Sequence, residues 1–409
     1  MTDLAEEHLV ASLDIGTSKV AIVIAEMNSF GVQRIIGIGT GFHNGLHRGI
    51  VSDVDGVRKA VMEAVIKAER MAQVVLPPVV VGIPGSFCSS FAASGAITIT
   101  RSNHQVQSED VERVLGAAEA VAIPPGRRVI HRFVRAFRLD GQHLEGQPLG
   151  LVGRRLEVDV QFVTAALAPL EGLIDCIEQA GVKIGEVIVQ CLAISDMVLA
   201  PSHRKLGVVL VDLGAGLTDV VVFRKGHLQH MACLPIGTDS LVRDLIIGLK
   251  VSPVEAEGLV RELGCNPDPE RFAGFWEGCQ GDSDIQIQLL DQYNEILMAR
   301  AEEIWQLVRS QVAKVGGVNL QAGVKMVGGG VLVPGLADLG SRILHLPVDA
   351  IVPVEMEDLP EAGRNPAYAA AVGLVRHRTV PLLALPEAHK SIPASWAVLW
   401  QKVRDWLKF

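Results

Sequence analysis

Two short segments, half a chain apart, carry residues that can bind phosphate. The first is ASLDIGTSKVAIVIAE, with Asp14 before Gly16, and the second is GVVLVDLGAGLTDVVVF, with Asp212 before Gly214. In each, an apolar run rich in β-branched residues leads to an aspartate, a glycine-bearing turn and a second apolar run, which predicts a β-hairpin. One such hairpin is weak evidence, because Asp and Gly are ordinary turn residues. Two copies predict two related α/β domains whose hairpins face each other across a cleft.

The residue types in these turns suit a nucleotide phosphate and a metal ion. Glycine lets backbone N–H groups approach phosphate oxygens without a Cβ clash, hydroxyl groups add donors, and Lys19 brings a positive charge. Because they stand at strand ends, Asp14 and Asp212 are candidates to hold Mg²⁺ through its water shell. The candidate phosphate-binding residues are Asp14, Gly16, Thr17, Ser18, Lys19, Asp212, Gly214, Ala215, Gly216, Thr218 and Asp219.

No side chain stands out as a catalytic base. Asp14 or Asp219 is an alternative for activating water, but an aspartate beside a metal site is more often structural or part of the metal shell. We therefore assign no catalytic residue.

A third glycine element follows in VKMVGGGVLVPGL, residues 324–336. An apolar strand leads into Gly328, Gly329 and Gly330, and a helix is predicted near Pro334. Glycines at this point allow the chain to pass flat beneath an adenine or a ribose. Taken alone, the triplet fits a simple strand-to-helix turn at least as well.

Composition excludes several classes of protein. The chain has 409 residues, 49% of them hydrophobic, which is enough for two or more domains. The net charge of −9 argues against a nucleic-acid partner. No uncharged apolar run is long enough to predict a transmembrane helix, and the acidic start is not a secretory signal. The six cysteines are scattered, which favours reduced thiols in a cytosol.

The segment SWAVLWQKVRDWLKF, residues 395–409, is unusually rich in tryptophan. As a helix it gathers an apolar face within an arc of roughly 120°. Three cations on or near the opposite side outnumber the single Asp, which is typical of a helix lying in a membrane interface. A helix docked on the protein's own core is the alternative. The face and its basic rim comprise Trp396, Leu399, Trp400, Lys402, Val403, Arg404, Trp406, Leu407 and Lys408.

The order of these elements resembles a known superfamily. Two aspartate–glycine hairpins followed by a glycine triplet is the order of the phosphate-1, phosphate-2 and adenosine motifs in actins, heat-shock chaperones and sugar kinases. Several segments more closely resemble the FtsA family of bacterial cell-division proteins. They are LDIGTSKV, the stretch 109–142, GLVGRRLEVDVQFVTA, the stretch 299–308 and the terminal amphipathic helix. The resemblance implies an α/β, actin-like (ribonuclease H-like) fold of duplicated domains around a nucleotide cleft, with the FtsA-type subdomain 1C.

The resemblance also implies an organisation into subdomains. Subdomain 1C contains a predicted helix over 108–121 with Ser108 as its N-cap. The boundaries are 1–80 and 166–196 for subdomain 1A, 81–165 for 1C, 197–238 and 310–380 for 2A, 239–309 for 2B, 381–394 for a proline-containing linker and 395–409 for the membrane-targeting helix.

The implied function is that of a scaffold rather than a metabolic enzyme. FtsA-like proteins bind ATP with Mg²⁺, form filaments on the cytoplasmic face of the inner membrane at the division septum, and anchor FtsZ there, recruiting later division proteins through subdomain 1C. Hydrolysis is at most weak. The resemblance places the C-terminal peptide of FtsZ on the helix that carries Asn294 and Arg300, with an acidic peptide residue facing Arg300.

Two departures from the superfamily pattern concern ATP affinity. Ala215 stands where the phosphate-2 loop usually has glycine. Members of the superfamily often place a Glu and a Lys three residues apart against the ribose and base. Here Glu257 is present, Val260 occupies the lysine position, and Arg261 is a candidate substitute.

Three rival functions remain open. A PilM-type pilus-assembly protein shares the fold and a related extra subdomain, but has no need of the Trp-rich tail. An ATPase or sugar kinase of the same superfamily requires a substrate base. A chaperone requires a substrate domain, and only about thirty residues follow residue 380.

We predict that Trp400→Glu releases the protein from anionic liposomes, because it places a charge in the middle of the apolar face. Lys402→Gln weakens binding only partly, and more so at low salt, since each basic residue contributes about 1 kcal/mol and is screened by salt. Co-sedimentation with liposomes checks both variants beside a 1–394 truncation. If Trp400→Glu instead unfolds the protein and leaves sedimentation intact, the segment belongs to the core.

Overall fold

The computed structural model describes residues 8–28, 31–265, 267, 269–275, 283–316, 319–351 and 368–377. The predicted linker 381–394 and amphipathic helix 395–409 lie outside these residues. In the stretch 266–284, which has no recognisable pattern in the sequence, residues 266, 268 and 276–282 lie outside them too.

Two five-stranded sheets with one and the same strand order make up the centre of the molecule. Written from corresponding edges, the first sheet runs β3–β2–β1–β6–β11 and the second runs β14–β13–β12–β15–β16. The strands are β1 His8–Ile15, β2 Lys19–Asn28, β3 Gly31–Phe42, β6 Val79–Ile83, β11 Ile184–Val189, β12 Val208–Leu213, β13 Thr218–Arg224, β14 His227–Leu234, β15 Val324–Val327 and β16 Val348–Ala350.

The duplication extends to strand direction. In each sheet the first three strands in the chain form an antiparallel meander. The fourth strand then pairs in parallel with the first, and the fifth pairs in parallel with the fourth. The two predicted hairpins, β1–β2 and β12–β13, are confirmed. Asp14 and Asp212 stand near the carboxyl ends of the equivalent strands β1 and β12, and ligands of α/β sheets bind outside such ends.

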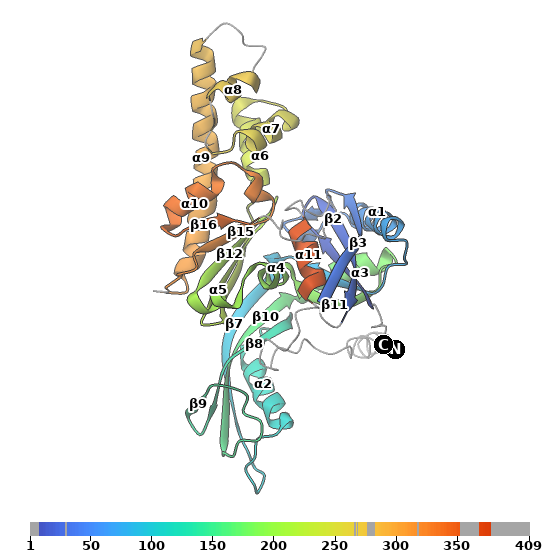
Figure 1. Cartoon of the computed structure of the whole chain (residues 1–409), viewed down its shortest axis with the longest axis vertical. Coiled ribbons are helices and arrows are strands. Elements are labelled where there is room, and N and C mark those ends of the chain that lie inside the picture. The colour runs from blue at the N-terminus through green and yellow to red at the C-terminus, as the bar shows by residue number, and fades with distance from the viewer. Residues whose placement is uncertain are drawn as a thin grey trace, which may run out of the picture.

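Helices cover both faces of the first sheet (Figure 1). Alternating strand residues turn Ile22 and Ile24 toward one face and Ala21 and Val23 toward the other. The first face lies under α1 Val54–Ala72 and α3 Leu167–Gln179, and the second lies under α4 Gln190–Val198 and α11 Ala369–His377.

Glycine brings α1 unusually close to the first sheet. Gly37, Gly39 and Gly41 alternate along β3, so all three face the helix. A Cβ at Gly39 would overlap the carbonyl oxygen of Ala64, and one at Gly41 would overlap that of Ala60. The strand therefore packs against the backbone of α1 rather than against its side chains.

A third sheet forms a separate unit at the bottom of Figure 1. Its strands are ordered β7–β10–β8–β9, and they pack with α2 around their own apolar core. The elements are β7 Cys88–Thr98, α2 Ser108–Ala122, β8 Arg127–Leu139, β9 Gln142–Leu144 and β10 Arg155–Ala166. The expected boundary at residue 81 falls inside β6, which pairs within the first sheet.

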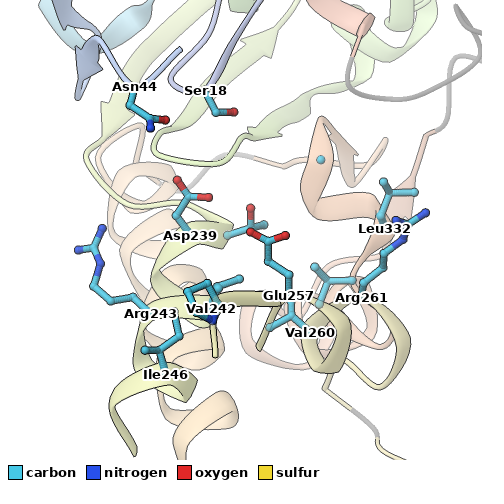
Figure 2. A pocket seen from close by; sticks show the side chains of 14 residues that line it. Ser18, Asn44, Asp239, Val242, Arg243, Ile246, Glu257, Val260, Arg261 and Leu332 are labelled. Atoms are coloured by element: carbon cyan, nitrogen blue, oxygen red, sulfur yellow. The ribbon is translucent and has the colours of Figure 1, made fainter. Parts of the chain in front are cut away.

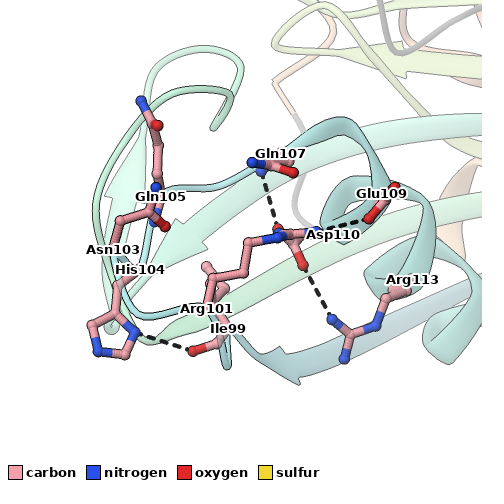
Figure 3. A network of polar contacts seen from close by, with 9 residues as sticks. All are labelled: Ile99, Arg101, Asn103, His104, Gln105, Gln107, Glu109, Asp110 and Arg113. Carbon is pink, nitrogen blue, oxygen red and sulfur yellow. Dashed lines mark hydrogen bonds and ion pairs between the residues drawn. The ribbon is translucent and has the colours of Figure 1, made fainter.

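The N-cap prediction for α2 is wrong by one residue. Gln107 is the cap and Ser108 is the first helical residue. The buried carboxylate of Asp110 accepts a hydrogen bond from the Gln107 N–H at 3.0 Å and also pairs with Arg101 and Arg113 (Figure 3). Burial alone would raise the pKa of Asp110, but these hydrogen bonds and charges hold it below its ordinary value.

The second sheet carries a helical unit that rises at the top of Figure 1. Trp305 on α9 is buried, and its indole N–H donates to the Leu336 carbonyl at 2.9 Å. Tyr293, also on α9, donates to the Gly264 carbonyl at 2.8 Å. The helices of this second half are α5 Pro201–Leu206, α6 Thr238–Leu249, α7 Pro253–Glu262, α8 Pro269–Phe275, α9 Ser283–Ala313 and α10 Leu336–Leu344.

We predict that Gly39→Ala lowers the free energy of unfolding by about 1–3 kcal/mol, because the added methyl must push α1 away from β3. Gly172→Ala is the control, since that glycine lies exposed on α3 with open space around it. The control is expected to be neutral or to stabilise by about 0.4–1 kcal/mol. Denaturant unfolding measures both, and equal stability of the two variants contradicts the close packing of β3 on α1.

Candidate functional site

The turns of the two hairpins meet at the centre of the molecule. Each is closed by the same backbone bond: Gly16 N–H donates to the Lys19 carbonyl and Gly214 N–H to the Leu217 carbonyl, both at 2.9 Å. A Cβ placed on Gly216 would stand 2.9 Å from the hydroxyl oxygen of Thr17. The duplicated turns therefore face each other at close range.

A cavity of about 530 Å³ opens beside this meeting point (Figure 2). The first half contributes Ser18 and Asn44, while the second half contributes α6, α7 and the glycine triplet. The lining residues are Ser18, Asn44, Thr238, Asp239, Val242, Arg243, Ile246, Pro253, Glu257, Val260, Arg261, Gly329, Leu332 and Val333. A pocket of this size suits a small ligand such as a nucleoside.

Each glycine of the triplet has a different surrounding. Gly328 has φ of 83°, and a Cβ there would overlap a carboxylate oxygen of Asp212. Gly330 is closed off by the side chain of Leu213. Gly329 has open space where its Cβ would be, and it lines the cavity. The triplet thus lets the chain pass close to Asp212 while it leaves one flat peptide facing the ligand space.

Three buried or half-buried aspartates gather behind the cavity. Burial raises the pKa of Asp14 to about 6, although Lys19 and a hydrogen bond from Gln190 act in the opposite direction. Burial, then the charges of Asp219 and Asp14, raise the pKa of Asp212 to about 8. Burial also raises the pKa of Asp219 to about 6. The cluster is therefore costly to ionise without an added positive charge.

The residues fit a cation that keeps its water shell. One carboxylate oxygen of Asp219, Oδ1, is buried and accepts no hydrogen bond from the described residues. Within the described ranges, no three His, Cys, Asp or Glu side chains stand close enough to ligate one ion directly. An ion bound by one or two carboxylates through water is the usual form of a Mg²⁺ site.

Two predicted phosphate-binding side chains have other contacts. The Thr218 hydroxyl is buried and donates to the Ile236 carbonyl at 2.7 Å. The Lys19 ammonium lies 4.2 Å from the centre of the Tyr368 ring, just before α11. Of the predicted nucleotide-binding residues, the cavity lining includes Ser18, Glu257 and Gly329.

Sequence reasoning missed several residues of this site. Gln190 begins α4, and its amide donates to Asp14 Oδ1 at 2.5 Å. Asn44, Asp239 and Arg243 line the cavity. The run IGTDS, which joins β14 to α6, is a helix-start signal that can reveal Asp239. No local pattern indicates Asn44 or Gln190.

Val260 and Arg261 both line the cavity, so the absence of the lysine expected at position 260 leaves an apolar wall beside an arginine.

The second predicted site lies on α9. Arg300 Nε donates to Asp244 Oδ2 of α6 at 2.6 Å, and the same guanidinium pairs with Glu303. Asn294 is half-buried on the same helix. Over the residues that the structure describes, no helix is both long and apolar enough to span a bilayer.

Comparisons with known proteins agree with this architecture. A family model described as "SHS2 domain inserted in FTSA" matches residues 85–164, and one described as "Cell division protein FtsA" matches residues 209–373. Cell division protein FtsA of Pseudomonas aeruginosa is 31% identical, covering 92% of this chain and 91% of the relative. The Escherichia coli protein of the same name is 30% identical, covering 100% and 99% respectively.

Solved structures show the same fold at lower identity. A PilM–PilN type IV pilus biogenesis complex has a TM-score of 0.61 at 16% identity, covering 91% of this chain and 98% of that chain. MreB5 of Spiroplasma citri bound to ADP has a TM-score of 0.51 at 11% identity, covering 92% and 98%.

Duplicated sheets with facing aspartate–glycine hairpins and an inserted third sheet define an actin-like fold of the kind with an extra subdomain. With relatives at this identity over nearly its whole length, the chain belongs to the FtsA family of cell division proteins. The predicted fold class and family are thereby confirmed.

We predict that Asp212→Asn changes how stability depends on pH. A carboxyl group whose pKa is raised on folding stabilises the fold while protonated, and this contribution is lost as pH rises from the ordinary value of 3.8 through about 8. Without metal or nucleotide, the melting temperature of the wild type should fall as pH rises through this window. The fall should be smaller for Asp212→Asn, whose melting temperature near pH 8 should exceed that of the wild type by at least about 2 °C. Asp175→Asn, at an exposed position on α3, is the control and should follow the wild type.

Proposed function

We propose that this protein binds ATP with Mg²⁺ between its two halves, assembles with copies of itself into filaments on the cytoplasmic face of the inner membrane at the division septum, and anchors FtsZ there. One observation carries the proposal: a cavity of about 530 Å³ adjoins two facing aspartate–glycine hairpins in a chain of the FtsA family. The MreB5 structure, which shares the fold, is bound to ADP, and this supports nucleotide binding as a capacity of the fold.

The nucleotide would use residues from both halves. Its ribose and base would lie in the cavity, with Glu257 toward the ribose hydroxyls and Gly329 beneath the base. Its phosphates would extend toward the two turns at the carboxyl edge of the sheets. The Gly16 and Gly214 N–H groups close those turns, so other backbone N–H groups of the turns would face the phosphates. Asp14 and Asp212 would hold Mg²⁺ through water, with Asp219 beside them. Bound Mg²⁺ supplies the positive charge that these carboxylates otherwise lack.

A scaffold role fits this site better than rapid catalysis. The Asp219 carboxylate accepts a hydrogen bond from the Cys233 thiol, and the Asp14 carboxylate accepts one from the Gln190 amide. Both contacts tie these carboxylates to neighbouring side chains of the protein. We therefore expect turnover far below the usual enzyme range of about 1–10³ per second.

Membrane attachment is proposed from the sequence pattern of residues 395–409. One tail has modest affinity, comparable to a single reversible lipid anchor. A filament displays many tails at once and so binds by avidity. The third sheet with α2 has its own core and projects away from both halves, which supports its proposed role as subdomain 1C, the surface for later division proteins.

A PilM-type role is the second candidate, since a PilM complex has the same fold. Its identity of 16% supports the fold alone, whereas relatives named cell division protein FtsA reach 31%. The Trp-rich tail also favours the division role.

We predict that Gly329→Val reduces ATP affinity at least tenfold, because its side chain would enter the cavity where the base lies. Gly116→Val is the matched control, at an exposed position on α2 with open space around it. Isothermal titration calorimetry with and without Mg²⁺ measures both. Asp212→Asn should weaken only the Mg²⁺-dependent part of the affinity. Unchanged ATP affinity in folded Gly329→Val and Asp212→Asn proteins refutes the assignment of the site.

We predict that Arg300→Glu weakens binding of the FtsZ C-terminal peptide at least fivefold and leaves ATP affinity unchanged, because it replaces the cation that faces an acidic peptide residue. Arg309→Glu makes the same charge change at an exposed position further along α9 and should bind like the wild type. Fluorescence anisotropy with labelled peptide decides between them. Equal affinity for all three proteins removes Arg300 from the site.

A further inference from the structure

Helices α6 and α9 approach closely beside Arg300. A Cβ on Gly248 of α6 would overlap the side chain of Ile296 on α9. One turn further along α9 stands Arg300, and one turn earlier on α6 stands Asp244. The crossing of the two helices therefore brings a cation and an anion from different elements together, with Arg300 Nε 2.6 Å from Asp244 Oδ2.

The ion pair is accessible from solvent. The side chains of Arg300 and Asp244 are 30% and 25% exposed, and that of Glu303 is 50% exposed. Ile247, the residue after the cavity-lining Ile246, is 68% exposed. The surface thus offers an arginine and an apolar side chain to a partner, but the arginine is already paired with the protein's own carboxylates.

One nitrogen of each edge through which an arginine holds a carboxylate already has an acceptor. A guanidinium binds a carboxylate with two parallel N–H groups, using either the Nε edge or the edge between its two terminal nitrogens. Asp244 accepts from Nε, and Glu303 accepts from Nη1. A carboxylate from outside that binds along the Nε edge with two hydrogen bonds must therefore compete with Asp244 for the Nε hydrogen.

We propose that Asp244 is an intramolecular competitor for the acidic residue of the peptide that docks at Arg300. This inference rests on the peptide site of the proposed function. Asp244 is the stronger rival, because it reaches Arg300 from another helix and is less exposed than Glu303. A pair three residues apart on one exposed helix contributes little.

Competition makes peptide binding an exchange of one carboxylate for another. The number of ion pairs at Arg300 then stays the same, so the affinity depends only weakly on salt. Removal of the Asp244 charge converts the exchange into the formation of a new pair, which is screened by salt. A partly exposed pair corresponds to a change in affinity of about 1.5- to 5-fold.

The test compares Asp244→Asn with Asp175→Asn in the full chain, using fluorescence anisotropy with the labelled FtsZ C-terminal peptide at low and high salt. Asp175 is exposed on α3 of the first half, so its substitution makes the same change in net charge on an element outside the peptide site. We expect Asp244→Asn to bind about 2- to 5-fold more tightly than the wild type at low salt and to lose this gain at high salt, while Asp175→Asn stays within about 1.5-fold of the wild type.

The outcomes separate this proposal from the function beneath it. If the wild type does not bind the peptide, or Arg300→Glu binds it equally well, the peptide site itself is wrong and Asp244 has nothing to compete with. If Arg300→Glu weakens binding but Asp244→Asn also weakens it or leaves it unchanged, the peptide site stands and the competitor role is overturned. An equal gain in both aspartate variants is an effect of net charge and overturns it as well.

Discussion

A cluster of three aspartates between the two halves, or lobes, of the molecule is the constraint on which this structure depends. Asp14, Asp212 and Asp219 stand where two sheets present the ends of equivalent strands. Burial makes their ionised forms costly, and repulsion from the other two carboxylates adds to the cost at Asp212. The hairpin turns, the tight passage at Gly328 and the Gln190 hydrogen bond all place the chain around this cluster. The lobes are thus arranged about a centre where an added positive charge would stabilise the ionised carboxylates.

Helix α6 shows how one element belongs to two sites. Its Asp239, Val242 and Arg243 form a wall of the cavity, while Asp244 pairs with Arg300 on α9. The helix begins directly after the meander of the second sheet, so its position follows the sheet that carries Asp212 and Asp219. The surface at Arg300 is therefore attached to the same framework as the cavity.

The inserted subdomain is joined to the second lobe as well as to the first. Arg135 of β8 donates to the carbonyls of Leu228 and Gln229 at 3.1 and 3.3 Å, and Ser90 of β7 is hydrogen-bonded with the backbone of Met231. A Cβ on Gly85, at the root of β7, would overlap a carboxylate oxygen of Asp219. The insertion thus contacts β14 along its length and reaches the charged centre at its base.

The sequence by itself determined the strands, the repeat and the family, because these depend on local patterns. Short β-branched apolar runs around Asp14 and Asp212 favour strands by local propensity, and the glycines beside them mark the turns. Tertiary structure alone decided where side chains point. Gln190 reaches Asp14 because it follows β11, which pairs with β6 as β6 pairs with β1. Asn44 enters the cavity from the first lobe, and the Thr218 hydroxyl turns away to Ile236. From the sequence, Arg300 is predicted to face an acidic residue of a peptide, whereas in the structure it meets Asp244 because α6 and α9 cross at Gly248. Such contacts join residues far apart in the chain, and no local period encodes the docking of one lobe or helix on another.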